Sequence, residues 1–186
     1  VKPNRQVQIV EYGGLKLLIP LTRSVDQEVQ RLTAHALANL SVNANNQKLM
    51  AGEGAIPCLI DLLESPLDLI QRQAAKSLAN LGVNADNKQI IANFGAIPKL
   101  IQLAAAAQIN VRIEAIAALA NLAVNDNNEM EIVQCGGLVP IVQSLELAAT
   151  GLQRQQGKSE RDITLLEELA TQTARSLRNL SVNGKQ

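Results

Sequence analysis

The chain has 186 residues, of which 47% are hydrophobic and 18% are charged, and its 17 basic residues balance its 17 acidic ones. A net charge of zero argues against a general nucleic-acid binder, which would carry a basic excess. Tyr12 and Phe94 are the only aromatic residues, which excludes base-stacking surfaces and aromatic cages for cations. The plentiful apolar residues predict a folded chain, and we expect no nucleic-acid partner.

Few residues in the chain carry metal or catalytic chemistry. Two cysteines, Cys58 and Cys135, are too few for a disulfide-rich scaffold or a four-thiolate zinc site. His35 is the only histidine, and no Cys, Asp or Glu lies at metal-ligand spacing from it. In 151–159, five residues separate two glycines where a phosphate-binding loop requires four. We therefore expect no metal, no cofactor and no enzymatic activity.

The sequence predicts no targeting or membrane segment. No apolar run approaches the ~20 residues of a membrane span, and the opening residues carry neither an initiator Met nor a signal-peptide pattern. We expect no direct membrane insertion, a cytoplasmic location with the nucleus as the alternative, and a chain that is a fragment of a longer protein.

A five-residue motif recurs along the chain. Asn-Leu-Ser-Val-Asn at 39–43 returns at a constant spacing as Asn-Leu-Gly-Val-Asn at 80–84 and as Asn-Leu-Ala-Val-Asn at 121–125. After a longer step it returns as Asn-Leu-Ser-Val-Asn at 179–183. A glycine followed by a small and then an apolar residue keeps the constant spacing at Gly13, Gly54, Gly95 and Gly136. A helical period of about 40 residues is typical of α-solenoids.

The repeat divides a single domain, residues 1–186, into the units 3–43, 44–84, 85–125 and 126–183. The longer last step implies about 17 inserted residues. Because the segment near 149–163 is polar, we expect the insertion there to form a loop between two helices.

Each unit predicts three helices, which the third unit shows most clearly. A short helix over 87–93 ends before Gly95, a second covers 96–106 with Pro98 in its first turn, and a third covers 110–123. The expected N-caps of the first helices are Asn45, Asp86, and Asp126 or Asn127.

The third helices place their apolar residues on one side, at about 100° per residue, and the first Asn of each motif away from that side. The expected core positions recur in every unit: Leu37, Leu78, Leu119 and Leu177; Leu40, Leu81, Leu122 and Leu180; Ala34, Ala75, Ile116 and Ala174; Val29, Ile70, Val111 and Leu169. We expect these faces to be buried between neighbouring units.

These features resemble the armadillo repeat family: a repeat of about 42 residues, the Gly-Ala-Ile-Pro opening of the second helix, and a third helix that ends in Asn-Leu. HEAT repeats have a similar period, but the short helix before each glycine argues against them. The resemblance implies an all-α fold, a right-handed α-solenoid of about four three-helix repeats. It also implies a concave groove, lined by the third helices, that holds an extended peptide.

The family's ladder asparagines, which hold the peptide backbone, correspond here to Asn39, Asn80, Asn121 and Asn179. Their chemistry suits that role, because an amide offers both a donor and an acceptor to a peptide bond without reading its side chain. The alternative is that these amides only satisfy helix C-terminal carbonyls or water.

Importin-alpha-like members of the family place Trp four residues before each ladder Asn. The corresponding residues here are His35, Lys76, Ala117 and Arg175, which argues against binding of basic nuclear-localisation peptides. Arg31 and Arg72 flank the same stripe, and Gln73 adds an adaptable polar contact. Together they predict an acidic or phosphorylated ligand. The alternative is a solvated helix face, because Glu28, Glu114 and Glu168 lie on or near this stripe too.

The function we expect is a non-enzymatic protein-protein interaction module that captures an extended, acidic segment of a partner. The alternative is a structural spacer or self-assembly element of a larger scaffold or cytoskeletal protein. That alternative includes self-association through exposed repeat ends, because solenoid ends without polar caps expose apolar faces.

Overall fold

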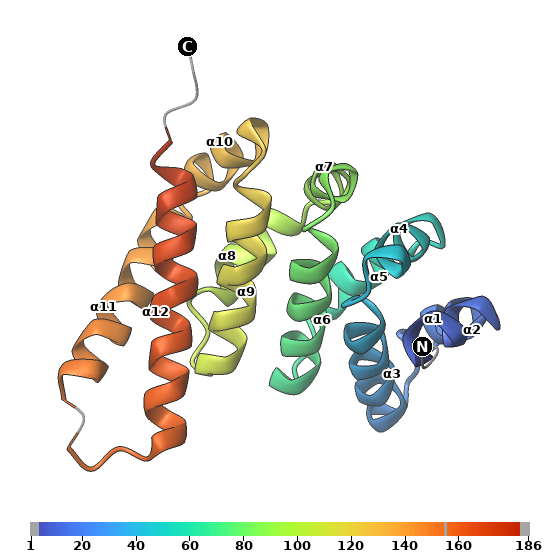
Figure 1. The fold of residues 1–186 in the computed structure, drawn as a ribbon, viewed down its shortest axis with the longest axis horizontal. Coiled ribbons are helices and arrows are strands. Elements are labelled where there is room, and N and C mark those ends of the chain that lie inside the picture. Colours follow the sequence, from blue (N-terminus) through green and yellow to red (C-terminus); the bar gives the residue numbers. More distant parts are fainter. Residues whose placement is uncertain (1–3, 155, 183–186) are drawn as a thin grey trace.

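A computed structural model describes residues 4–154 and 156–182, which form twelve α-helices and no strand (Figure 1). The first helices of the units are α1 (Arg5–Glu11), α4 (Ala44–Gly52), α7 (Ala85–Asn93) and α10 (Asp126–Gln134). The second helices are α2 (Gly14–Leu21), α5 (Ala55–Leu62), α8 (Ala96–Leu103) and α11 (Leu138–Gln153). The third helices are α3 (Gln27–Leu40), α6 (Asp68–Leu81), α9 (Ile109–Leu122) and α12 (Glu160–Leu180).

This order confirms the predicted all-α solenoid, while its right-handedness and its exact repeat count stay predictions. The predicted unit bounds at residues 3 and 183 lie outside the described residues. Within residues 4–154 and 156–182, no helix alone is long and apolar enough to cross a membrane. α10 and α11, bent by 83° at their junction, pass the length and composition test only as a pair.

The last Asn of each of the first three motifs caps the first helix of the next unit. Asn43 and Asn84 each accept hydrogen bonds from two backbone N–H groups in the first turn of the following helix, and Asn125 accepts one. The prediction of Asn45, Asp86 and Asp126 or Asn127 as N-caps was therefore wrong. The motif Asn keeps an extended backbone (for Asn84, φ is −72° and ψ is 133°), which lets its side chain reach the free N–H groups of the helix start.

A left-handed glycine joins the first helix of a unit to its second, as predicted. Gly54 and Gly95 have φ values of 81° and 76°, a conformation that residues with a Cβ rarely adopt. Pro57 and Pro98 follow inside the first turn of α5 and α8, where a missing N–H removes no helical hydrogen bond.

The third helices lie side by side in the order α3, α6, α9 and α12, and each packs on the second helix of its own unit (Figure 1). Leu37, Leu78 and Leu119 occupy the same repeat position and are at most 1% exposed. Burying a Leu side chain of this kind contributes roughly 1.5–3 kcal/mol. The predicted core of the first three units is thus confirmed at this position.

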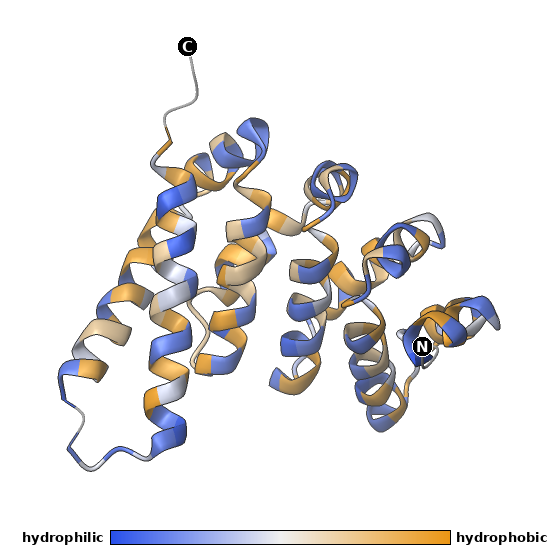
Figure 2. Cartoon of the chain, viewed as in Figure 1, coloured by the Kyte–Doolittle hydropathy of each residue, from blue (hydrophilic) through white to orange (hydrophobic). Residues whose placement is uncertain are grey.

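The fourth unit differs from the prediction. Ala174 is exposed and Leu177 is half-buried, whereas Ala75, Ile116, Leu78 and Leu119 at the same repeat positions are buried. The expectation of equal burial in all four units was wrong, because no described helix covers the outer side of α12. At the left edge of the array, Figure 2 shows that α11, the neighbour of α12, also carries hydrophobic residues.

The insertion in the fourth unit is mostly helical, so the prediction of a loop over 149–163 was wrong for most of its length. α11 has 16 residues against 8 in α5 and α8, and α12 has 21 against 14 in α6 and α9. Ala148 and Leu166 are buried, and a Cβ on Gly151 would lie 2.8 Å from Leu166, so the two extensions pack closely. Ser159 begins α12 with a capping box to Asp162. Residue 155 lies outside the described residues.

A second column of asparagines connects the first helices. Asn46, Asn87 and Asn128 are at most 2% exposed. Their Nδ2 groups donate to the carbonyls of Gln6 (3.1 Å), Gln47 (3.2 Å) and Lys88 (3.2 Å) on the first helix of the preceding unit. These bonds specify how one unit sits on the next.

Candidate functional site

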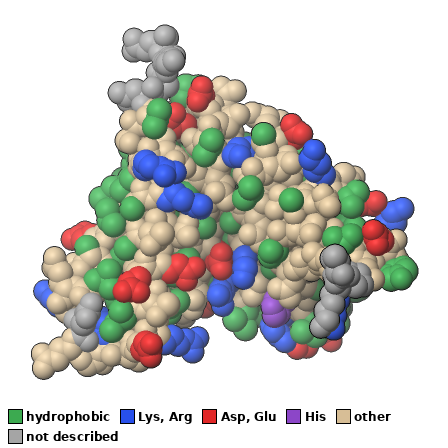
Figure 3. All heavy atoms as spheres, viewed as in Figure 1, with side chains coloured by type: hydrophobic (Ala, Val, Ile, Leu, Met, Phe, Trp, Pro, Cys, Tyr) green, Lys and Arg blue, Asp and Glu red, His purple; other side chains and the backbone are tan. Residues whose placement is uncertain are grey.

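The outward side of α3, α6, α9 and α12, here called the third-helix face, carries the predicted site residues. These helices lie toward the viewer in Figure 1, and Figure 3 shows the same face in space-filling form. Because the four helices share one register, each unit presents the same positions on this face: the ladder Asn, the residue four before it, and the residues seven and eight before it.

Three of the four ladder asparagines bond to the C-terminal end of the preceding third helix. The Nδ2 of Asn80 donates to the Ser41 hydroxyl at 3.0 Å, that of Asn121 to the Ala79 carbonyl at 2.7 Å, and that of Asn179 to the Ala120 carbonyl at 2.8 Å. For Asn121 and Asn179, one amide N–H therefore satisfies a carbonyl near a helix C-terminus, which is the alternative role considered for these amides.

The remaining hydrogen-bonding capacity differs among the four amides. No described residue donates a hydrogen bond to Oδ1 of Asn80 or Asn121, and both side chains are half-buried. Oδ1 of Asn179 accepts from Arg178 at 3.1 and 3.2 Å, and Asn39 is exposed. Asn80 and Asn121 thus keep an acceptor and a second N–H on amides whose orientation the neighbouring unit holds.

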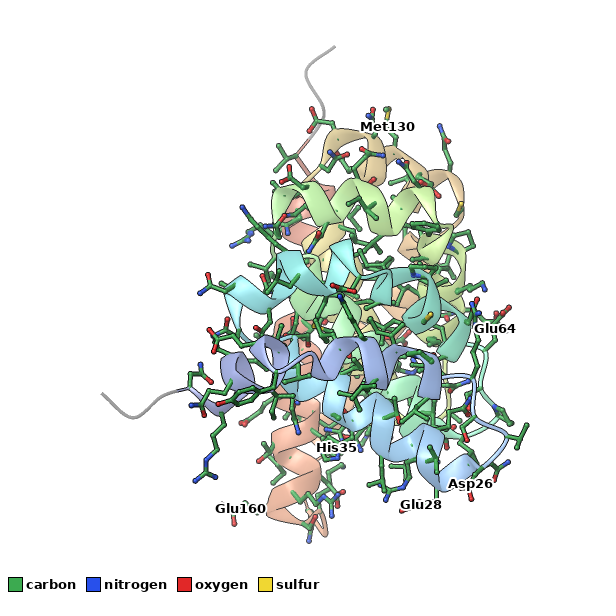
Figure 4. All side chains as sticks on the ribbon, turned by 90° about the vertical axis from the view of Figure 1, so that its right-hand side faces the viewer. Asp26, Glu28, His35, Glu64, Met130 and Glu160 are labelled. Carbon is green, nitrogen blue, oxygen red and sulfur yellow. The ribbon has the colours of Figure 1, made fainter. Side chains whose placement is uncertain are left out.

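The residues four before the ladder Asn have different surroundings. His35 is exposed on α3 (labelled in Figure 4), and Lys76 is half-buried on α6. Ala117 is 9% exposed, and Arg175 reaches across it from α12 to donate to its carbonyl at 3.2 Å. Burial lowers the pKa of Arg175, and the neighbouring charge of Arg178 lowers it further. Arg175 is thus held against α9.

Arg31 is already paired. Its guanidinium donates to both carboxylate oxygens of Glu28, at 2.6 and 2.7 Å, on the exposed first half of α3. The hydrogen bond from Arg31 lowers the pKa of the Glu28 carboxyl. Figure 4 labels Glu28 near the start of α3, beside the capping residue Asp26. A ligand acid would have to displace Glu28 to use Arg31.

The middle of the third-helix face holds charges of both signs, the central charge cluster: Arg72, Lys76, Glu114 and Glu168. Nε of Arg72 lies 3.8 Å from Oε1 of Glu114, and the two side chains are 37% and 15% exposed. Burial raises the pKa of the Glu114 carboxyl. The positive charges of Lys76 and Arg72 oppose that rise, and the negative charge of Glu168 adds to it. Figure 3 shows acidic and basic side chains next to one another on this face.

The predicted site residues therefore lie in three groups: around α6, on α3 and on α12. Asn80, Lys76, Arg72 and Gln73 come together on α6, with Asn121 and Glu114 beside them on α9, the helix packed against it. Asn39, His35 and Arg31 lie on α3, and Asn179 and Arg175 lie on α12. Sequence reasoning missed Ser41 as the partner of Asn80, although Ser41 follows the first motif's Asn-Leu directly.

The chemistry available on this face is hydrogen bonding and charge pairing. Residues 4–154 and 156–182 contain no group of three or more His, Cys, Asp or Glu side chains placed to hold a metal ion.

Comparison with known proteins agrees with this architecture. An armadillo-like family model matches residues 3–146, and no curated protein matches the chain. One solved structure, an engineered protein, is 29% identical with a TM-score of 0.80 over 94% of this chain and 65% of its own. A second engineered protein is 28% identical with a TM-score of 0.77 over 96% of this chain. This chain spans only 40% of the length of that protein.

A designed armadillo repeat protein in complex with the peptide (KR)4 has a TM-score of 0.72 at 22% identity, over 90% of this chain and 67% of its own. At that identity the likeness concerns the fold alone. Since the family model spans most of the sequence and the helices follow its repeat, the chain belongs to the armadillo-like family.

Proposed function

We propose that this chain is a protein-binding module that holds an extended peptide along the third-helix face, with the peptide backbone bonded to Asn80 and Asn121. The observation that carries the proposal is the repetition of half-buried amides at the same position of two neighbouring repeats, each with a carbonyl oxygen to which no described residue donates.

The spacing of the repeats suits an extended ligand. Packed helix axes lie about 8–10 Å apart, and an extended chain advances ~3.3 Å per residue. Neighbouring amides would therefore meet peptide groups two or three residues apart. Main-chain bonds would supply affinity for many sequences, and the side chains between the amides would supply selectivity.

The designed armadillo repeat protein that is complexed with (KR)4 supports a peptide as the class of ligand. For this chain we propose an acidic contact instead, centred on Arg72 and Lys76. His35 would contribute from α3, whereas Arg31 and Arg175 are engaged by Glu28 and by the Ala117 carbonyl. We propose no catalysis and no nucleic-acid partner.

The test uses a displayed library of random peptides, selected on the full chain, with the affinity of an enriched peptide measured by fluorescence anisotropy. Asn80→Ala together with Asn121→Ala removes two amides, each worth about 0.5–1.5 kcal/mol, and should weaken binding by roughly 5- to 150-fold.

Ser41→Ala is the matched control, because it removes the Asn80–Ser41 bond and keeps the Asn80 amide. Its affinity should stay within about threefold of the wild type. Equal affinity of the double variant and the wild type, or no enriched peptide, would contradict the proposal.

A second candidate function is assembly through the repeat ends, which one observation favours. Ile9, Leu17 and Leu21 are 46%, 72% and 43% exposed, whereas their counterparts one repeat later, Met50, Cys58 and Leu62, are 0%, 8% and 3% exposed. Light scattering against concentration tests it. Association that Leu17→Glu abolishes supports assembly, and a monomer at all concentrations contradicts it.

A further inference from the structure

We propose that the central charge cluster selects a mixed-charge pair on the ligand. An acidic side chain would bind Arg72 and Lys76, and a basic side chain two residues away would bind Glu114 and Glu168. The inference rests on the proposed function, because it specifies the ligand of the same surface.

The ion pair at the centre of the cluster is incomplete. Nε of Arg72 and Oε1 of Glu114 are 3.8 Å apart, beyond hydrogen-bond distance. Nε of Arg72 is buried and has no hydrogen-bond partner among the described residues. Both groups are partly removed from water, which strengthens any bond a ligand adds. A ligand cannot reach the buried Nε itself, but the Arg72 and Glu114 side chains are 37% and 15% exposed, and this exposed part can bind a ligand carboxylate and a ligand cation.

A completed pair on the same face shows the contrast. Arg31 and Glu28 lie three residues apart on one helix, and two bonds of 2.6 and 2.7 Å satisfy them. In the central cluster the opposite charges come from different helices: Arg72 and Lys76 from α6, Glu114 from α9 and Glu168 from α12. The cluster thus presents a basic side and an acidic side along the direction in which the repeats stack.

The distance between these two sides sets the ligand spacing. In an extended chain, side chains at positions i and i+2 point the same way and lie about 6.6–6.8 Å apart, while those at i and i+1 point to opposite sides. The charged groups of Arg72 and Glu114 lie 3.8 Å apart, so the acidic and basic side chains at i and i+2 would converge to reach both. The fitting ligand is acid-X-base, with X any residue.

Ligands of a single charge fit this cluster less well. A peptide with Asp-X-Asp would place its second carboxylate beside Glu114 and Glu168, and one with Lys-X-Lys would place an ammonium beside Arg72 and Lys76. Like charges at partly buried sites oppose binding.

The experiment compares five peptides on one neutral scaffold, carrying Asp-X-Lys, Lys-X-Asp, Asp-X-Asp, Lys-X-Lys or Asn-X-Gln, by fluorescence anisotropy on the full chain. The better of the two mixed orders should bind at least about tenfold more tightly than either single-charge peptide. Raising the salt concentration should reduce that advantage.

Glu114→Gln is the matched variant, because glutamine already occupies the same repeat position at Gln73 and Gln172. In this variant the Asp-X-Asp peptide should gain affinity and the mixed peptide should lose it. Single-charge binding as tight as mixed binding in the wild type, or no change with Glu114→Gln, would overturn the inference.

The double variant Asn80→Ala with Asn121→Ala separates the two proposals. If all five peptides bind the wild type equally and all weaken in the double variant, backbone capture stands and the charge inference fails. If no peptide binds, or if the double variant binds the peptides as tightly as the wild type does, the proposed function fails as well.

Discussion

Ile91 and Ile9 occupy the same position of the repeat, on the first helices α7 and α1, and differ in burial. Ile91 is 0% exposed and belongs to the main core, whereas Ile9 is 46% exposed. The difference arises because described helices cover α7 on both sides along the array and α1 on one side only. The pair therefore isolates what stacking on a neighbour contributes.

The expected magnitudes follow from the carbon atoms removed. Ile91→Ala deletes buried groups worth roughly 0.8 kcal/mol each and leaves a cavity, so we expect a loss of about 2–5 kcal/mol. A loss of about 3 kcal/mol lowers Tm by about 6–12 °C in a chain of this size. Ile9→Ala removes half-exposed groups that leave an open surface, so its cost should be about 1 kcal/mol or less.

The assay is urea unfolding followed by far-UV circular dichroism. It is paired with hydrogen exchange, because repeat arrays do not always unfold in one step. Ile91→Ala should lower the unfolding midpoint and the exchange protection of α7 and its neighbours. Equal costs for the two substitutions would refute the reasoning, because burial between repeats would then not explain stability.

Three further predictions concern caps and charge. Asn84→Ala removes the cap of α7 and should cost about 1 kcal/mol in urea unfolding, whereas Asn45→Ala, one residue inside α4, should cost less. Burial raises the pKa of Glu114 above its ordinary 4.5, so the folded protein holds that proton more tightly than the unfolded chain does. This carboxyl therefore lowers stability above its folded pKa, and the penalty disappears as the pH falls below 4.5. Glu114→Gln should raise the urea midpoint at neutral pH and leave it unchanged near pH 4; a lower midpoint at neutral pH would show that the charge attraction to Lys76 and Arg72 outweighs the cost of burial. Ser159→Ala breaks the capping box of α12 and should speed hydrogen exchange in its first turn and not in α9; unchanged exchange there would contradict the role of the cap.

Local pattern explains the parts of the fold that were predicted correctly. Positions such as Leu78 and Leu119 recur once per repeat on one side of a helix, and Gly95 ends a helix whatever surrounds it. These features depend on periodicity and backbone conformation, which a sequence displays directly.

The features that were missed depend on contacts between distant residues. Asn87 bonds to a carbonyl 40 residues earlier, and nothing beside it in the chain indicates that partner. The polar residues over 149–163 predict a loop, whereas Leu166 packs closely against Gly151 and both Ala148 and Leu166 are buried, so α11 and α12 extend into this segment. Arg31 and Arg72 occupy equivalent positions, and only the structure separates the paired cation from the one with unused capacity.

The side-chain amide resonances of asparagine offer the most direct measurement of peptide capture. During titration with a peptide selected from the displayed library, the Nδ2 resonances of Asn80 and Asn121 should shift in proportion to the bound fraction. Those of the buried Asn87 and Asn128 should stay in place, because their amides lie inside the stack of first helices. Saturating binding that leaves Asn80 and Asn121 unshifted would contradict capture of the backbone by these amides.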